Sequence, residues 1–139
     1  MNHREIELNL RKVGSAFILG RGASLEKIRE TEAKLGINFP IEIIHFYETL
    51  NGLSVTSPKF ELLPVEELQQ KNELIIFGHF NGCIPVGFES SSINSAEQWN
   101  IVNSTNGYVI TLTISSFLTN KIWAWLLRGR EVWEKELYT

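Results

Sequence analysis

Residues 22–52 read GASLEKIRETEAKLGINFPIEIIHFYETLNG, and this stretch predicts two helices joined by a tight corner. Ser24 is a good N-cap for the first helix, because the apolar residues that follow it recur at helical spacing. Gly36 suits the left-handed C-cap that ends this helix. Pro40 fits the first position of the second helix, where its missing N–H costs nothing. We expect the second helix to end at residues 51–52, an Asn-Gly pair.

The same stretch carries a recognisable order of residues. An apolar residue is followed four positions later by Glu, then by Leu-Gly, then by an aromatic residue before Pro, and the next helix ends in Asn-Gly. The matching positions are Ile28, Glu32, Leu35, Gly36, Phe39, Pro40, Asn51 and Gly52. In these positions the chain resembles the SUKH superfamily, which includes fungal cell-wall-assembly regulators and many bacterial immunity proteins.

The resemblance continues at two later points. Gly78 follows Phe77 and Gly82 precedes an expected strand, as in the family, and residues 115–118 match the opening of the family's last helix. One position departs from the pattern: the turn at residues 79–82 lacks the acidic residues that many relatives carry. The resemblance implies a structural role for Glu32 and the glycines of the motif.

The composition is that of one ordinary globular domain. The chain has 139 residues, of which 43% are hydrophobic, and we expect a single domain over residues 1–139. No apolar run approaches the roughly 18 residues of a membrane helix, and residues 1–12 lack an apolar signal core. The one cysteine, Cys83, indicates a reducing compartment. These features predict a cytoplasmic protein that does not bind membranes.

The charge distribution is unusual. The net charge is −3, and all sixteen acidic residues are Glu. Between Lys71 and Lys121 there is no Lys or Arg, and the only charged residues are Glu73, Glu89 and Glu97. This excludes a continuous basic stripe across the middle of the chain and argues against nucleic-acid binding. The absence of Asp also removes Asp-based metal and triad chemistry.

The segment before the motif has two interpretations. A helix is expected through about Val13, and residues 14–23 then contain three glycines around an apolar core. This segment is either a packed connector or a short strand followed by Gly20-Arg21-Gly22, which resembles a phosphate-binding turn. The phosphate-binding pattern needs a glycine at position 25, where Leu25 stands, so we favour the connector.

After residue 52 the periodicity changes from helical to extended. Strands are expected at residues 53–55, 60–63, 74–77, 83–88, 99–102 and 108–114, with a short helix at 64–68, a loop at 89–98 and a final helix from Ser115 or Ser116 to about 127. Asn81-Gly82 is a type I′ hairpin signal. Pro85 indicates an edge strand or a bulge. Helices followed by a strand meander and a last helix predict an α+β fold around an antiparallel sheet.

No catalytic group stands out. Cys83 and His79 could form a nucleophile and base, but we expect Cys83 in the core, where cysteine is commonly found. The three histidines have no metal-ligand spacing, so neither a metal nor another cofactor is expected. Glu32, on an apolar helical stripe, could be an acid or base. We favour a structural role, in which it accepts hydrogen bonds from backbone N–H groups at the start of the next helix.

The candidate partner-binding residues are aromatic and acidic. Trp99 follows a polar loop that carries Glu89 and Glu97, which makes it the best anchor candidate. Trp123 lies off the main stripe of its helix and is either an interface anchor or covered by Val132 and Trp133. Glu66-Glu67 would form a solvated face or part of an acidic partner surface.

Two classes of function remain, a non-catalytic binding module and a small enzyme using Glu32, His79 and Cys83. The resemblance implies the former: an immunity protein that neutralises a cognate toxin domain, or a regulatory scaffold like the fungal relatives. We expect no catalysis. The sequence does not determine the partner or the oligomeric state.

Overall fold

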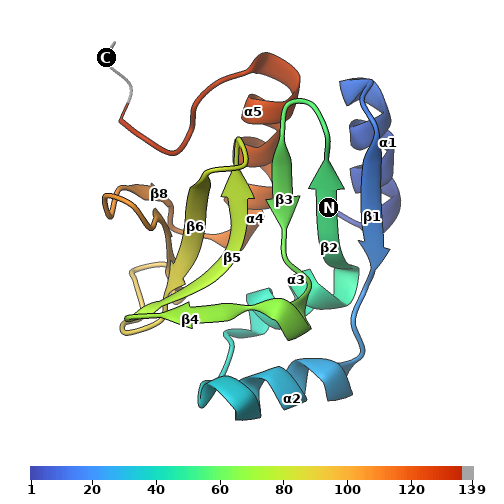
Figure 1. Ribbon diagram of the computed structural model, residues 1–139. Coiled ribbons are helices and arrows are strands. Elements are labelled where there is room, and N and C mark those ends of the chain that lie inside the picture. Colours follow the sequence, from blue (N-terminus) through green and yellow to red (C-terminus); the bar gives the residue numbers. More distant parts are fainter. Residues whose placement is uncertain (136–139) are drawn as a thin grey trace.

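The computed structural model describes residues 1–135 and is built on one twisted eight-stranded sheet (Figure 1). The strands are β1 (Phe17–Arg21), β2 (Leu50–Val55), β3 (Phe60–Leu62), β4 (Gln69–Lys71), β5 (Leu74–Phe80), β6 (Ile84–Glu89), β7 (Asn100–Asn103) and β8 (Val109–Thr111). Their order is β1-β2-β3-β5-β6-β7-β8, and β4 pairs with β5 beside this path. Every pairing is antiparallel, which confirms the predicted α+β fold.

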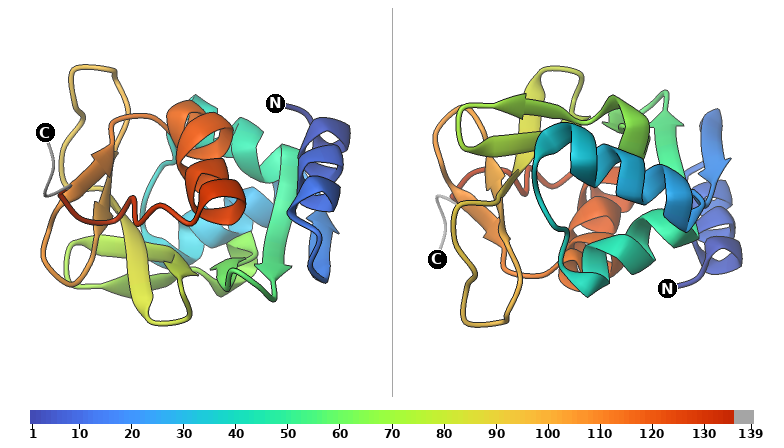
Figure 2. Two further views of the ribbon diagram at one scale, coloured as in Figure 1. Left: turned by 90° about the horizontal axis from the view of Figure 1, so that it is seen from above. Right: turned by 90° about the horizontal axis from the view of Figure 1, so that it is seen from below.

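The helices are distributed unequally over the two faces of the sheet. They are α1 (His3–Val13), α2 (Leu25–Leu35), α3 (Ile41–Thr49), the short η1 (Val65–Glu67), α4 (Ile114–Ser116), the π-helical η2 (Phe117–Lys121) and α5 (Ile122–Arg128). Figure 2 shows α3, α4 and α5 on one face, with α1 beside the edge strand β1 and α2 below the sheet. Within residues 1–135, no helix is long and apolar enough to cross a membrane.

The hydrophobic core fills the space between the sheet and this helical layer. One cluster of buried side chains runs from Ile6 in α1 to Trp133 in the C-terminal segment. At its centre the rings of Phe77 and Phe88 are stacked with centroids 3.9 Å apart, and Phe117 contacts Phe77 edge-on at 5.4 Å. Neighbouring strands and the last helical segment are therefore joined by aromatic packing.

The helical pair at residues 22–52 forms as the sequence predicts, apart from its end. The Ser24 hydroxyl accepts a hydrogen bond from the Lys27 N–H at 3.2 Å. Gly36 adopts the left-handed conformation at φ 68° and ends α2. Pro40 is the N-cap residue of α3, one position before the first helical position that was predicted for it. However, α3 ends at Thr49, and β2 begins before the Asn-Gly pair, so this pair lies within a strand rather than after a helix.

One strand was the less favoured interpretation of its segment, and another was not predicted. Residues 14–23, favoured as a connector, contain the edge strand β1, which pairs with β2 from Phe17 opposite Val55. Strand β4 consists of three exposed polar residues and forms only because it pairs with β5. Neither strand has the alternating apolar pattern from which strands are recognised. The partner of β1 is β2, far along the chain, whereas β4 pairs with the adjacent β5 across a tight turn at residues 72–73.

The C-terminal half differs from expectation in two further details. The strand expected at residues 108–114 is limited to β8, because the backbone turns earlier into the last helical segment. The cap of that segment is Thr113 rather than Ser115 or Ser116, and its hydroxyl accepts a hydrogen bond from the Ser116 N–H at 3.1 Å.

Pro85 occupies an internal strand, which corrects the expected edge position. Strand β6 pairs with β5 on one side and β7 on the other. Pro85 is the second residue of β6, near its start, where proline is tolerated. The bulge lies instead on β5 between Ile76 and Gly78. The Asn81-Gly82 turn is as predicted: both residues have positive φ, 54° and 75°.

Gly22 brings the end of β1 against the end of α3, and this contact can be tested by substitution. A Cβ atom at Gly22 would lie 1.7 Å from the Glu48 carbonyl oxygen, so a side chain there must displace backbone. We expect Gly22→Ala to lower the free energy of unfolding by about 1–3 kcal/mol, measured by urea denaturation.

The matched control is Gly36→Ala, which introduces a side chain at φ +68° with no atom within 4 Å of the new Cβ. This variant should lower the free energy of unfolding by only about 1 kcal/mol, because alanine disfavours the left-handed conformation. An unchanged urea midpoint for Gly22→Ala would show that the two backbones are not in close contact.

Candidate functional site

Glu32 is a buried carboxylate that joins α2 to the start of α3. Its side chain lies in the last turns of α2 and is only 5% exposed. One carboxylate oxygen accepts a hydrogen bond from the Phe39 N–H at 2.7 Å, and the other accepts one from Arg29 Nη1 at 2.7 Å. Both oxygens are therefore engaged within the chain, as the structural interpretation of this residue predicts.

The other motif positions shape the same corner. Ile28 is fully buried in the core, Leu35 is partly buried against it, and the Ile37 N–H closes the last turn of α2 by donating to the Glu32 carbonyl at 3.0 Å. Pro40 accepts through its carbonyl from the first N–H groups of α3, those of Ile43 and Ile44. These residues position helices and offer no reactive group.

Asn51 links β2 to η1 through both ends of its side-chain amide. Its Oδ1 accepts a hydrogen bond from the Val65 N–H at 2.6 Å, and its Nδ2 donates to Glu66 Oε1 at 3.0 Å. Glu66 in turn pairs with Lys27 Nζ of α2 at 2.8 Å. The predicted solvated face at Glu66 is thus a contact between η1, β2 and α2.

The protonation of Glu66 reflects these contacts. Burial acts to raise the pKa of the Glu66 carboxyl, but hydrogen bonds from Lys27 and Asn51 together with the Lys27 charge outweigh it, so the pKa lies below its ordinary value of 4.5. The same pair raises the pKa of Lys27 above 10.5.

The glycines of the segment Gly20-Arg21-Gly22, for which a phosphate-binding turn was the less favoured interpretation, serve close backbone packing. A Cβ at Gly20 would lie 2.0 Å from the Asn51 carbonyl oxygen. At the motif position Gly78 the corresponding distance, to the Glu61 carbonyl oxygen, is 2.5 Å. Gly52 has φ +94° and faces Pro64. At Gly20 and Gly78 a neighbouring strand leaves no room for a side chain, and at Gly52 the positive φ favours glycine.

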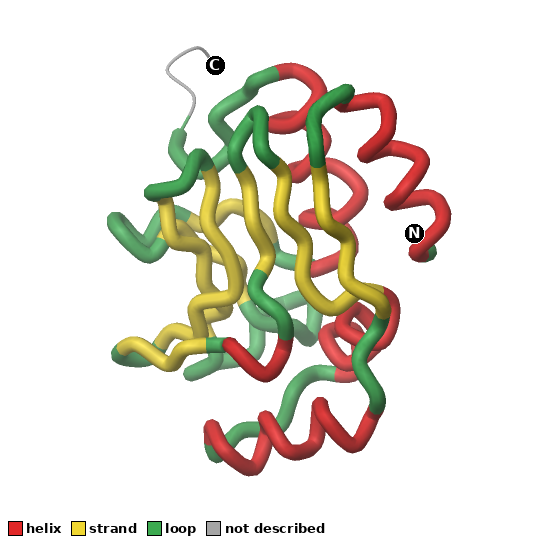
Figure 3. The backbone as a smooth tube through the Cα atoms, turned by 45° about the vertical axis from the view of Figure 1, so that its right-hand side comes forward, coloured by secondary structure: helices red, strands yellow, loops and turns green. Residues whose placement is uncertain are grey.

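One face of the sheet is left open by the helices. Figure 3 shows no helix in front of the upper parts of β1, β2 and β3. A row of residues crosses this outward face from strand to strand in direct register: Ile18, Ser54, Glu61, His79 and Pro85. We call these five residues the outward row. Only alternate residues of each strand point this way, and their neighbours enter the core.

The outward row has an apolar end and a charged centre. Ile18 is 75% exposed, more than any other large hydrophobic side chain in residues 1–135. Glu61 Oε1 lies 2.8 Å from His79 Nδ1. The two atoms are close, but their geometry is not that of a hydrogen bond. The alternation Phe60-Glu61-Leu62 indicates that Glu61 points away from the core. The exposure of Ile18 was not predicted, because a connector was favoured for residues 14–23.

Two hollows adjoin Glu61 on either side. The larger, about 270 Å³, lies over β1, β2 and the end of β3, with Ile18, Leu63, Pro64 and Glu67 among its lining residues. The smaller, about 140 Å³, is lined by Lys59, His79 and Gly82 among others. Ser54 and Glu61 line both hollows, so the outward face is not flat but contains two adjoining depressions.

Trp99 and Trp123, predicted as partner-binding residues, are both buried. Trp99 is 5% exposed and packs against Phe39 and Phe88, with ring centroids 6.0 and 6.1 Å away. Trp123 is 8% exposed. Their indoles are not available as surface anchors, because core packing takes up the aromatic area that an interface would need. Val132 and Trp133 do fold back, and Trp133 packs against Trp125 with centroids 4.8 Å apart.

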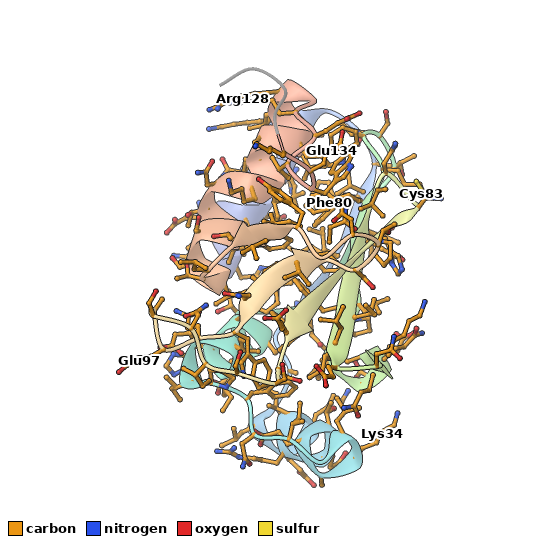
Figure 4. The ribbon with its side chains drawn as sticks, turned by 90° about the vertical axis from the view of Figure 1, so that its left-hand side faces the viewer. Lys34, Phe80, Cys83, Glu97, Arg128 and Glu134 are labelled. Carbon is orange, nitrogen blue, oxygen red and sulfur yellow. The ribbon has the colours of Figure 1, made fainter. Side chains whose placement is uncertain are left out.

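Glu89 and Glu97 remain accessible but do not form an acidic patch free of positive charge. Glu97 is exposed at the tip of the loop between β6 and β7, far from Cys83 in Figure 4. Glu89 is half-buried at the end of β6 and pairs in register with Leu74. Lys71 lies opposite the same Leu74 on the β4 side. The long stretch without Lys or Arg is therefore next to a lysine in space.

The residues of the alternative enzyme site are not brought together. Glu32 is on α2 below the sheet, whereas Cys83 lies at the tip of the β5–β6 hairpin, and Figure 4 shows Lys34 of α2 and Cys83 far apart. Cys83 is exposed, contrary to the expected core position, because it directly follows the Asn81-Gly82 turn. Among residues 1–135, no three His, Cys, Asp or Glu side chains are grouped so that they could hold a metal ion.

Comparison with known families agrees with the motif and the fold. The family model described as SMI1 / KNR4 family (SUKH-1) matches residues 22–138. The chain belongs to this family. The match begins at Gly22, so the SUKH-1 part contains the corner at Glu32, the Asn51 contacts and most of the sheet, while α1 and β1 precede it. Among curated proteins, none shows significant similarity to the chain.

The structural role of Glu32 predicts a loss of stability when it is removed. Glu32→Ala leaves the buried Phe39 N–H without its acceptor, so we expect the free energy of unfolding to fall by about 1–3 kcal/mol in urea denaturation. The control is Glu30→Ala on the exposed side of the same helix, which should stay within about 0.5 kcal/mol of the wild type. Equal effects of the two variants would contradict the role assigned to Glu32.

The Glu66 contacts predict a particular pH dependence. Because the folded-state pKa is lowered, the stabilisation from this carboxylate is present above the unfolded value and is lost as the pH falls through the lower folded value. An NMR titration should therefore give Glu66 a midpoint below 4.5, and Lys27→Met should move it upward. Lys34→Met, at the other end of α2, should leave the midpoint unchanged. A wild-type midpoint above 4.5 would rule out the ion-paired arrangement.

Proposed function

We propose that this chain is a non-catalytic protein-binding module that acts as an immunity protein in the cytoplasm. In this role it covers a surface of a cognate bacterial toxin domain and so blocks its action. The observation that carries the proposal is membership of the SUKH-1 family, whose superfamily includes many such proteins. The single cysteine, which has no possible partner within the chain, supports a reducing compartment.

The geometry supports binding over catalysis. Glu32 and Asn51 are the motif residues with polar side chains. Both accept hydrogen bonds from backbone N–H groups of the same chain. His79, whose Nδ1 faces Glu61, lies on an open face, and Cys83 lies at an exposed hairpin tip, so both groups stay in contact with water. An open sheet face with shallow hollows suits a protein surface better than a small substrate, which is usually enclosed.

The experiment is co-expression with the product of the neighbouring reading frame. We expect the neighbour alone to stop growth, and growth to be restored when this chain is produced with it. Glu97→Lys, at an exposed position, should weaken the rescue if the β6–β7 loop contributes to association, since reversing a rim charge slows the encounter of complementary surfaces. Glu30→Lys on α2 is the matched control. Trp99→Ala would not be informative, because it opens the core.

A regulatory scaffold of the cell-wall-assembly type is the second candidate, since the same family includes such proteins. It predicts a different outcome of the same experiment. The neighbour would then not be toxic, and the chain would co-purify with other proteins of its host. A neighbour that is harmless and leaves no complex with this chain would exclude the immunity role.

A further inference from the structure

The larger hollow on the outward face combines small and apolar lining residues. Gly20, Gly52 and Ser54 line it together with the apolar Ile18, Leu63 and Pro64. Its lining residues come mainly from β1, β2 and the end of β3. Figures 1 and 3 show no helix in front of these strands. The volume of the hollow, about 270 Å³, is below the roughly 300–1,000 Å³ of typical small-molecule sites, so it suits one side chain better than a cofactor.

The charge of this hollow has one sign. Two carboxylates line it, Glu61 from β3 and Glu67 from η1, and none of its lining residues is Lys, Arg or His. The Glu67 carboxylate has no ion-pair or hydrogen-bond partner among residues 1–135. Glu61 contacts His79 on the side of the smaller hollow, which leaves its other side facing the larger one.

An apolar wall beside two carboxylates matches one kind of side chain. Arginine and lysine carry a positive group on an aliphatic stem, and the stem gains from apolar contact while the charged end stays near water. Arginine fits better than lysine, because its planar guanidinium can stack on flat surfaces such as Pro64 and bind two carboxylate oxygens at once. The neighbouring Ile18, 75% exposed, would be covered by the same partner.

We propose that the hollow formed by Ile18, Gly20, Gly52, Glu61, Pro64 and Glu67 is a docking site for an arginine side chain on a partner protein. The stem of the arginine lies against Ile18 and Pro64, and its guanidinium lies between Glu61 and Glu67. This inference rests on the proposed protein-binding function and adds the surface and the chemistry of the contact.

The test uses a probe that needs no knowledge of the partner. The ¹⁵N-labelled chain is titrated with N-acetyl-arginine methylamide and, in parallel, with the citrulline analogue, which has the same shape without the charge. We expect saturable shifts of the Gly20, Gly52, Ser54 and Leu63 amides with arginine, and about tenfold weaker binding of citrulline. The difference should shrink as salt is added, because the carboxylates are partly exposed.

Two double variants separate charge at the hollow from charge elsewhere. Glu61→Gln with Glu67→Gln should abolish the preference for arginine while the remaining amide signals stay in place. Glu26→Gln with Glu30→Gln, which removes two exposed carboxylates from α2, should leave the preference intact. The proposal is overturned by shifts outside the hollow, by the absence of saturable shifts, or by equal binding of arginine and citrulline.

This experiment is independent of the rescue assay. Arginine binding without rescue would refute the immunity role and keep the site, whereas rescue without arginine binding would keep the role and refute the site.

Discussion

The contact between the Glu32 carboxylate and the Phe39 N–H is the constraint on which the first half of the structure depends. A carboxylate near the C-terminal end of a helix is disfavoured by the helix dipole and by burial, so it requires compensating donors. Phe39 and Arg29 supply them. The contact fixes the direction in which the chain leaves α2 and hence the orientation of α3. Because α3 continues directly into β2, the same corner also sets the position of the sheet.

A second set of contacts joins β2 back to α2 through η1. Strand β2 is tied to η1 through Asn51, and Glu66 of η1 is tied back to Lys27 on α2. The Thr31 hydroxyl lies 3.3 Å from the Val65 carbonyl and adds a buried hydrogen bond between the same two elements. Helix α2 is thus held at Lys27 and Thr31 by η1 and at Glu32 by the start of α3. The exposed ion pair contributes little alone, whereas Asn51 satisfies a backbone N–H that would otherwise lack an acceptor.

The features that were predictable from the sequence are those decided locally. The caps at Ser24 and Gly36 and the turn at Asn81-Gly82 depend on a few adjacent residues, and all three form as expected. The polar strand β4, which pairs with the adjacent β5, was not predicted. Strand β1 was not the favoured interpretation, because it depends on β2, a partner that is distant in sequence. The burial of Trp99 was missed for the same reason, because Phe39 and Phe88 cover it only after the sheet is assembled.

The motif residues and the residues on the outward face have different roles in this fold. Glu32, Gly36 and Asn51 are committed to backbone contacts within the chain, so a substitution there is felt by the whole scaffold. Ile18, Ser54 and Glu61 stand on the outward face and make few contacts that the fold requires, so other side chains could replace them at little cost in stability. The family motif therefore accounts for the scaffold. The choice of partner has to come from residues outside the motif, and the face that no helix covers is where such residues are free to change.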